Sequence, residues 1–147
     1  MATFDKNKFQ LPPDGFKDQL WDETESLNYI EISKQWLENV KNNEKNAIYL
    51  CEVEVAGTTY ISDIEFIARN IKKGDYIKLK LEDQNEYDEN AIALFSTLGR
   101  KIGYVKKEKN EVLSNLMRYG KELFAKLIFK EEVNHWNRFI VEIYMFD

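Results

Sequence analysis

From residue 47 onward, apolar side chains recur in short alternating runs separated by turn residues, and this pattern limits the possible folds more than any other feature. The run over residues 76–81 is the clearest, because Ile77, Leu79 and Leu81 alternate with a tyrosine and two lysines. Alternation with a period of two predicts a strand that buries one face. Comparable runs predict further strands over residues 47–56, 91–95, 101–105, 123–129 and 139–146.

Short helices are predicted between these strands. Ser62 and Glu65 have the spacing of a helix capping box, and apolar residues continue the pattern to Ile71. A second helix is predicted over residues 107–119 and ends at Gly120. Because strands do not alternate regularly with long helices, a doubly wound nucleotide-binding sheet is disfavoured. We expect a mainly β protein (α+β), built as a six-stranded, OB- or SH3-like small barrel with two short helices.

The N-terminal third of the chain differs in character from the rest. A polar segment with a pair of prolines predicts an irregular arm, and residues 27–41 carry apolar side chains at helical spacing. A polar stretch over residues 42–46 separates this helix from the first strand. We therefore expect an N-terminal arm and helix over residues 1–46, followed by a barrel domain over residues 47–147.

Composition and motifs exclude several classes of function. Cys51 and His135 are the single cysteine and the single histidine, which excludes an intramolecular disulfide and a multi-cysteine or two-histidine metal site. The sequence has no glycine-rich phosphate loop and no nucleophile–base motif, so we expect no enzyme activity, no cofactor and no metal. Cys51 is expected to be a buried, unreactive thiol, and His135 to lie in a hairpin turn. No membrane span or signal peptide is found, and we expect a cytoplasmic location.

Charge is unevenly distributed along the chain. The net charge of −5 argues against a non-specific nucleic-acid binder. Residues 100–130, however, contain nine basic and three acidic side chains, and several of the lysines follow closely after Tyr104. A cationic groove with aromatic side chains is typical of proteins that bind single-stranded nucleic acid. A solvated helix face beside a strand is the alternative interpretation of the same residues.

The most specific motifs lie between residues 53 and 105. Residues Asn85–Ile92 match N-x-Y-D-x-N-A-I, and residues Gly99–Val105 match G-x-x-x-G-Y-V. Over residues 49–146 the chain resembles the HIRAN domain, a module of eukaryotic fork-remodelling DNA translocases that also occurs alone in many small bacterial and phage proteins. The resemblance does not extend to residues 1–46. It implies an OB-like barrel and a non-enzymatic role in DNA binding.

The resemblance also implies roles for particular residues. In one vertebrate member, the HIRAN domain captures the 3′ end of single-stranded DNA and recognises its free 3′-hydroxyl. Tyr60 matches an aromatic residue that stacks on a terminal base. Asn85, Tyr87 and Asp88 match the loop that holds the end nucleotide, and Asp88 is placed to accept a hydrogen bond from the 3′-hydroxyl.

Further matching positions concern the phosphates. Tyr104 occupies the position of a phosphate-contacting histidine, and Lys107 matches a phosphate-contacting lysine, with Lys106 beside it. Thr59 stands where the eukaryotic domain has an arginine, so one contact to the DNA is missing. The predicted partner is single-stranded or 3′-ended DNA, and the predicted setting is DNA repair, recombination or phage biology.

Two alternatives are left open at this point. Tyr87 and Asp88 also fit a structural turn in which Asp88 accepts hydrogen bonds from backbone amides. The alternative function is a protein-interaction or dimerisation module, in which residues 1–46 cover the barrel groove or provide the surface for a protein partner or a homodimer.

Overall fold

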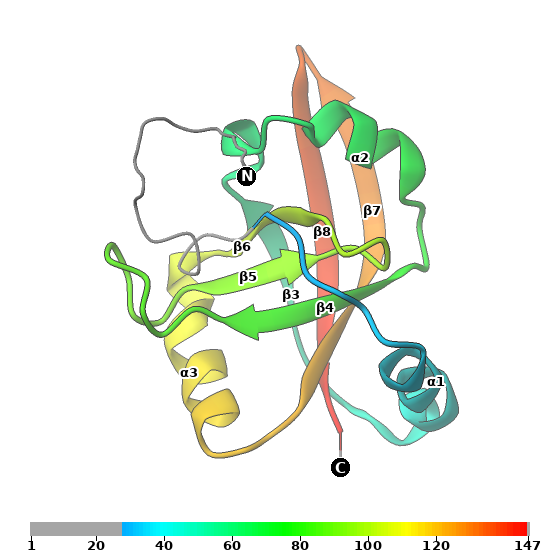
Figure 1. Cartoon of the computed structure of the whole chain (residues 1–147), viewed down its shortest axis with the longest axis vertical. Coiled ribbons are helices and arrows are strands. Elements are labelled where there is room, and N and C mark those ends of the chain that lie inside the picture. Colours follow the sequence, from blue (N-terminus) through cyan, green and yellow to red (C-terminus); the bar gives the residue numbers. More distant parts are fainter. Residues whose placement is uncertain (1–27, 147) are drawn as a thin grey trace.

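Within residues 28–146, which the computed structural model describes, six antiparallel strands close into a barrel with three α-helices around it (Figure 1). The strand order is β3-β6-β5-β4-β7-β8, and β8 pairs with β3 to close the barrel. The elements are α1 (Lys34–Asn43), η2 (Glu44–Asn46), β3 (Ile48–Ala56), η3 (Thr58–Tyr60), α2 (Ile64–Asn70), β4 (Tyr76–Leu81), β5 (Ile92–Phe95), β6 (Lys101–Val105), α3 (Lys107–Arg118), β7 (Leu123–Val133) and β8 (Trp136–Met145). The predicted small six-stranded barrel is confirmed.

Apolar side chains on the inward faces of the strands fill the barrel. In β4, Ile77 and Leu79 are buried while Lys80 is exposed, as the alternation of a half-buried strand requires. Ile67 of α2 and Leu113 of α3 pack against the same core. The other strands contribute buried aliphatic residues to it: Val53, Val55, Ile92, Leu94, Ile102, Val105, Leu123, Leu127, Val141 and Ile143.

The last two strands are longer than predicted. β4 pairs with β7 only as far as Lys126, and β3 pairs with β8 only from Ile140 onward. Beyond these points β7 and β8 continue as a two-stranded ribbon, which the charged residues in this part of the sequence concealed. The ribbon ends in a two-residue turn at Asn134 and His135, whose φ values of 52° and 67° are those of a tight hairpin. The predicted position of His135 in a hairpin turn is confirmed.

The N-terminal helix begins later than predicted, at Lys34 instead of residue 27. Ser33 provides the cap, because its side chain accepts a hydrogen bond from the backbone N–H of Trp36 at 3.0 Å. The preceding residues 28–30 are not helical, since their backbone pairs with the turn before β6 through hydrogen bonds at Gly99 and Lys101. The part of the predicted arm that precedes residue 28 lies outside the described residues.

α1 packs on the outer surface of the barrel. Val40 is completely buried there, and the Lys78 ammonium lies 5.1 Å from the centroid of the Trp36 ring. In η2, which follows α1, the Glu44 carboxylate accepts a hydrogen bond from the Lys126 ammonium of β7. These contacts attach the described part of the N-terminal segment to the outer faces of β4 and β7.

α2 also begins differently from the prediction. Asp63, and not Ser62, is the residue before its first turn, and the Asp63 side chain makes no capping hydrogen bond, so the predicted capping box is wrong. The preceding segment forms the 3₁₀-helix η3, in which the Thr58 hydroxyl donates to the backbone oxygen of Asn137 at 2.9 Å. None of the helices within residues 28–146 has the length and apolar character needed to cross a membrane.

Gly103 of β6 allows β6 and β3 to approach each other. Its φ is 151°, and a Cβ atom on it would lie 2.4 Å from the backbone oxygen of Ala56. Gly103→Ala is therefore expected to lower the free energy of unfolding by about 1–3 kcal/mol, measured by urea unfolding. Gly120→Ala is the matched control, because Gly120 also has a positive φ but no atom within 4 Å of its Cβ position. Equal losses in the two variants would contradict the steric explanation.

Candidate functional site

Most of the residues predicted to bind nucleic acid line one groove. It lies where the loop between β4 and β5 (residues 82–91) meets the start of α3 and the ends of β3 and β6, and its volume is about 330 Å³. Figure 1 shows this loop projecting from the barrel beside α3. The lining residues are Ala56, Asn85, Tyr87, Asp88, Ala91, Tyr104, Val105, Lys107 and Asn110. Five of the seven predicted residues are among them.

Asn85 organises the first half of the loop. Its Oδ1 accepts hydrogen bonds from the backbone N–H groups of Tyr87 at 2.8 Å and Asp88 at 3.1 Å, which is an Asx-turn. Its Nδ2 donates to Oε1 of Glu82 at 3.0 Å. Asn85 thus uses most of its hydrogen-bonding capacity within the loop, and its effect on a ligand acts through the position of Tyr87.

Asp88 is half-buried and held on both carboxylate oxygens. Oδ2 accepts a hydrogen bond from Nδ2 of Asn110, and Oδ1 accepts one from the backbone N–H of Asn90, each at 2.9 Å. The bond from Asn110, then that from Asn90, lower the pKa of Asp88 below its ordinary value, and the nearby Lys107 charge adds to this effect. Asp88 is therefore ionised at neutral pH, and each oxygen keeps a lone pair for one more donor.

α3 holds the second half of the loop. Ser114 Oγ and Arg118 Nη1 donate to Oδ1 of Asn90 at 3.1 and 2.8 Å, and Arg118 Nη2 donates to the backbone oxygen of Glu89 at 2.6 Å. The loop is thereby fixed on both sides of Tyr87, whose side chain is 88% exposed. A large aromatic ring is thus presented to solvent from an ordered backbone.

A buried ion pair lies beneath the groove. Nζ of Lys101 donates to Oε2 of Glu82 at 3.0 Å, and the two side chains are only 2% and 3% exposed. Nζ of Lys101 also donates to the hydroxyl of Tyr104 at 2.9 Å, and that hydroxyl donates to Oε1 of Glu82 at 2.9 Å. The three groups form a closed triangle of hydrogen bonds that joins the end of β4 to both ends of β6.

Burial shifts the pKa values of Lys101 and Tyr104. Burial lowers the pKa of Lys101, and the negative charge of Glu82 opposes that change. Burial and, secondarily, the Glu82 charge raise the pKa of Tyr104, so its phenol is neutral. Because both neighbours already engage the Tyr104 hydroxyl, the part of Tyr104 that faces a ligand in the groove is its ring.

The remaining predicted residues lie beside the groove. Tyr60 is 89% exposed at the end of η3. Gly57 lies between the rings of Tyr60 and Tyr104. A Cβ atom added to Gly57 would lie 3.9 Å from a ring carbon of each. Lys106 is the residue immediately before α3 and does not line the groove. Tyr60 therefore extends the aromatic surface beyond Tyr104, whereas Lys106 adds only charge nearby.

The basic residues between positions 100 and 130 do not form a single patch. Among the described contacts, Arg100 pairs with Asp63 at 2.6 Å, so it does not serve the groove. Other basic side chains of this segment make contacts within the fold: Lys101, Arg118, Lys126 and Lys130. Lys107 is the lysine among the lining residues of the groove. The local excess of positive charge in the sequence is thus spread over the surface and interior.

Several groove residues were not predicted. Ala91 and Val105 belong to the two quoted motifs, so their place in the groove could have been inferred from the motifs themselves. Asn110 follows Lys107 by three positions in α3 and shares its helix face, which was the available signal. No sequence signal pointed to the pairing of Glu82 with Lys101, because charged residues are usually exposed.

Residues 28–46 do not cover the groove. None of them is among its lining residues, and their contacts fall on the turn before β6 and on the outside of β4 and β7. The predicted alternative, in which residues 1–46 block the groove, therefore receives no support from residues 28–46. Residues 1–27 lie outside the described part of the chain.

Cys51 was predicted to be a buried, unreactive thiol, and the structure buries it only in part. It is half-buried and packs against the barrel core. Burial raises the pKa of its thiol, which disfavours the reactive thiolate form at neutral pH.

A closed antiparallel barrel of six strands with small helices places the fold among the small OB-like barrels. The family model for the HIRAN domain matches residues 48–145. The chain belongs to the HIRAN domain family, which confirms the resemblance seen in the sequence.

Two crystal structures share this fold. A crystal structure of a protein from Lactobacillus plantarum is 25% identical, with a TM-score of 0.63, and the match covers 67% of this chain and 94% of that one. The crystal structure of the HIRAN domain of human HLTF is 19% identical, with a TM-score of 0.54 and coverages of 67% and 78%. An NMR structure of the HLTF HIRAN domain in its DNA-bound conformation is 18% identical, with a TM-score of 0.49 and coverages of 71% and 83%. A search of curated proteins found no match.

Lys101→Met tests whether the buried pair supports the fold. The variant leaves the Glu82 carboxylate buried without its charged partner, so a loss of about 3–5 kcal/mol in the free energy of unfolding is expected. Lys80→Met removes a lysine from an exposed position in β4 and should change stability by less than about 0.5 kcal/mol. Chemical denaturation of both variants provides the measurement. If Lys101→Met were as stable as Lys80→Met, the pair would have no structural importance.

Proposed function

We propose that the protein is a non-enzymatic DNA-binding module that holds the end of a single strand in the groove beside Tyr87. One observation carries the proposal: an exposed aromatic ring and a carboxylate, on a loop that hydrogen bonds hold in place, line the same groove as a lysine of α3. Membership of the HIRAN family supports DNA as the partner, because the 3′-end capture implied by the resemblance falls on these same residues.

Stacking would supply most of the affinity. Tyr87 and Tyr60 are 88% and 89% exposed, which leaves their ring faces available to bases. Tyr60 is held by its backbone N–H, which donates to the oxygen of Gly57 at 3.1 Å. Stacking of one base on an aromatic side chain contributes about 1–3 kcal/mol and tolerates any base. Two such rings suit a short, sequence-independent contact with a strand end.

Lys107 is the natural partner for a phosphate. It is the first residue of α3, so the ammonium lies at the end of the helix where the first N–H groups have no partner within the helix and the helix dipole is positive. Glu108 in the same turn reduces the local positive charge. We therefore expect one to three phosphate contacts, and a modest salt dependence with a slope of about −1 to −2 in a plot of log K against log salt.

Asp88 favours an end over an internal nucleotide. An ionised carboxylate repels a phosphate, so its presence in a DNA-binding groove needs a reason. A hydroxyl group can donate to the lone pairs that Asn90 and Asn110 leave free on Asp88. A DNA strand has a free hydroxyl at its 3′ end and none at internal positions. The proposed ligand is therefore a strand with a free 3′-hydroxyl. A role in DNA repair, recombination or phage biology and a cytoplasmic location stay predictions.

The first test compares two ends on one oligonucleotide. Fluorescence anisotropy at low salt is measured for a labelled short single strand that carries either a 3′-hydroxyl or a 3′-phosphate. We expect binding to the 3′-hydroxyl strand and at least tenfold weaker binding to the 3′-phosphate strand, because Asp88 repels the added phosphate. Equal affinities would show a strand binder that does not read the end, and absence of binding to both would overturn the proposed function.

Tyr87→Ala tests the stacking contact. It is expected to weaken binding by roughly 5- to 150-fold, because one stacked base loses its aromatic partner. Tyr119→Ala is the matched control, since Tyr119 is 86% exposed at the opposite end of α3 and should not change the affinity. Lys107→Ala should weaken binding and flatten the salt dependence, while Lys121→Ala should not. If Tyr87→Ala lowered the thermal midpoint while affinity stayed unchanged, Tyr87 would serve only the turn.

A further inference from the structure

A short segment before α1 crosses the outside of the barrel, and we call residues 28–33 the strap. At its start, the backbone oxygen of Asn28 accepts a hydrogen bond from the N–H of Lys101 at 2.7 Å. The N–H of Ile30 donates to the backbone oxygen of Gly99 at 2.8 Å. Figure 1 shows the strap crossing β6, β5 and β4 on its way to α1. The strap precedes the part of the chain that matches the HIRAN family model, so it is an addition to that module.

The strap lies over a part of the outer barrel surface that is buried. Leu94 belongs to the barrel core, so the alternation along β5 places the next residue, Phe95, on the outer face. Phe95 is nevertheless 0% exposed. It pairs with Lys101 of β6, where the strap begins, and with Lys78 of β4, which lies beside Trp36 where the strap has passed into α1. Since the strap runs from the first of these positions to the second, it passes over Phe95.

The side chains of the strap have the pattern of a strand that covers a surface. Ile30 and Ile32 are half-buried, whereas the residues on either side of Ile30 are exposed. This alternation places both isoleucines on the barrel side. Lys101, to which the strap is bonded, is only 2% exposed. The strap therefore helps to keep the ion pair of Lys101 and Glu82 away from water.

Lys101 connects the strap to the groove loop. Its backbone N–H is bonded to the strap, and its ammonium donates to Oε2 of Glu82 at 3.0 Å. Oε1 of Glu82 accepts a hydrogen bond from Nδ2 of Asn85 at 3.0 Å. Oδ1 of Asn85 accepts one from the backbone N–H of Tyr87 at 2.8 Å. A continuous series of hydrogen bonds thus runs from the strap to the residue that presents its ring in the groove.

We propose that the strap positions the groove loop for binding, because it fixes Lys101 and keeps the pair with Glu82 dry. This role rests on the proposed function, since it concerns the same DNA site. When the strap is displaced, water reaches the ion pair, and hydrated charges hold each other less firmly than buried ones. Glu82 is then a less rigid acceptor for Asn85, and the turn that carries Tyr87 is less ordered. An element outside the HIRAN match thereby controls how well the groove is formed.

Gly99→Ala displaces the strap in the full chain. Gly99 has a φ of 82°, and a Cβ atom on it would lie 2.0 Å from the backbone oxygen of Ile30. Gly74→Ala is the matched control, because Gly74 has a φ of 98° and no atom within 4 Å of its Cβ position. Both variants carry the strain of alanine at a positive φ, but only the first moves the strap. Ile30→Ala leaves the backbone intact and is expected to act in the same direction by a smaller amount, which provides the test if Gly99→Ala does not fold.

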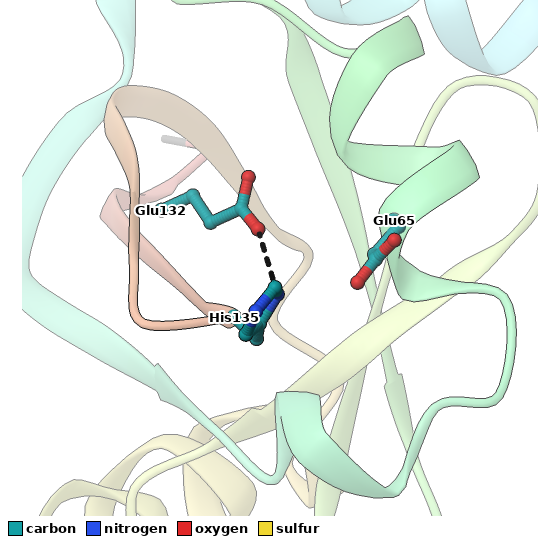
Figure 2. A group of neighbouring side chains, drawn as sticks. All are labelled: Glu65, Glu132 and His135. Carbon is teal, nitrogen blue, oxygen red and sulfur yellow. Dashed lines mark ion pairs between the residues drawn. The ribbon is translucent and has the colours of Figure 1, made fainter.

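Amide hydrogen exchange, measured by NMR without DNA, is the first readout. The two backbone N–H groups that donate to Asn85 should exchange at least about fivefold faster in Gly99→Ala than in Gly74→Ala, because the turn opens more often. The end of the β7–β8 ribbon is the reference region, since Glu132 and His135 there (Figure 2) take no part in the series of hydrogen bonds. A general loss of stability would speed exchange at the ribbon as well and would contradict a specific effect on the loop.

DNA affinity is the second readout. Anisotropy with the 3′-hydroxyl strand should show binding about 2- to 30-fold weaker in Gly99→Ala and unchanged in Gly74→Ala. In an Asn85→Ala background, Gly99→Ala should cause little further loss, because the connection from the strap to Tyr87 is already broken. Equal loop exchange in the two glycine variants would overturn the role of the strap, whether or not DNA binds. Faster loop exchange in Gly99→Ala, in a protein that binds no DNA, would support the role of the strap and overturn only the proposed function.

Discussion

The arrangement around the groove depends on one buried charge. The Lys101 ammonium lies inside the barrel wall, where an unpaired charge would cost several kcal/mol. Glu82 and the Tyr104 hydroxyl compensate that cost by forming a closed triangle with it. Because Glu82 also accepts a hydrogen bond from Asn85, the triangle sets the wall of the groove and the start of its loop together. The position of the exposed Tyr87 ring thus follows from a pair of charges that does not itself line the groove.

In the loop from residue 82 to residue 91, some side chains hold the loop in place and one aromatic side chain is exposed to solvent. The side chains of Asn85, Asp88 and Asn90 form hydrogen bonds with the loop and with α3. The aromatic residue of the loop, Tyr87, points to solvent. The structural and the binding interpretation of the N-x-Y-D motif are therefore compatible, because the turn that Asn85 and Asp88 stabilise is what holds the Tyr87 ring in an exposed position. A site that is already ordered avoids the entropy cost of fixing side chains when a ligand binds.

The barrel could be predicted from sequence because alternation in stretches such as residues 76–81 depends only on neighbouring positions. The loop could be located because its Asx-turn is built from residues two and three positions apart. Features that depend on distant partners could not be predicted. Residues 28–30 have helical spacing, but their backbone pairs with Gly99 and Lys101. The sequence alone predicts an exposed Lys101, because its burial depends on the distant Glu82. The basic residues after position 100 suggested one positively charged patch. Several of them instead pair with distant residues, so their charges are spread over the fold.

The closure of the barrel has a consequence for how the protein acquires its structure. β8 is the last strand within residues 28–146, and it pairs with both β7, its neighbour in sequence, and β3, the first strand of the barrel. Pairing of β3 with β8 joins residues nearly one hundred positions apart, such as Ile48 and Met145. Such non-local contacts slow folding, because a long loop must close before they form. During synthesis the apolar face of β3 therefore stays uncovered until β8 has been made. The chain is most prone to aggregation in this interval.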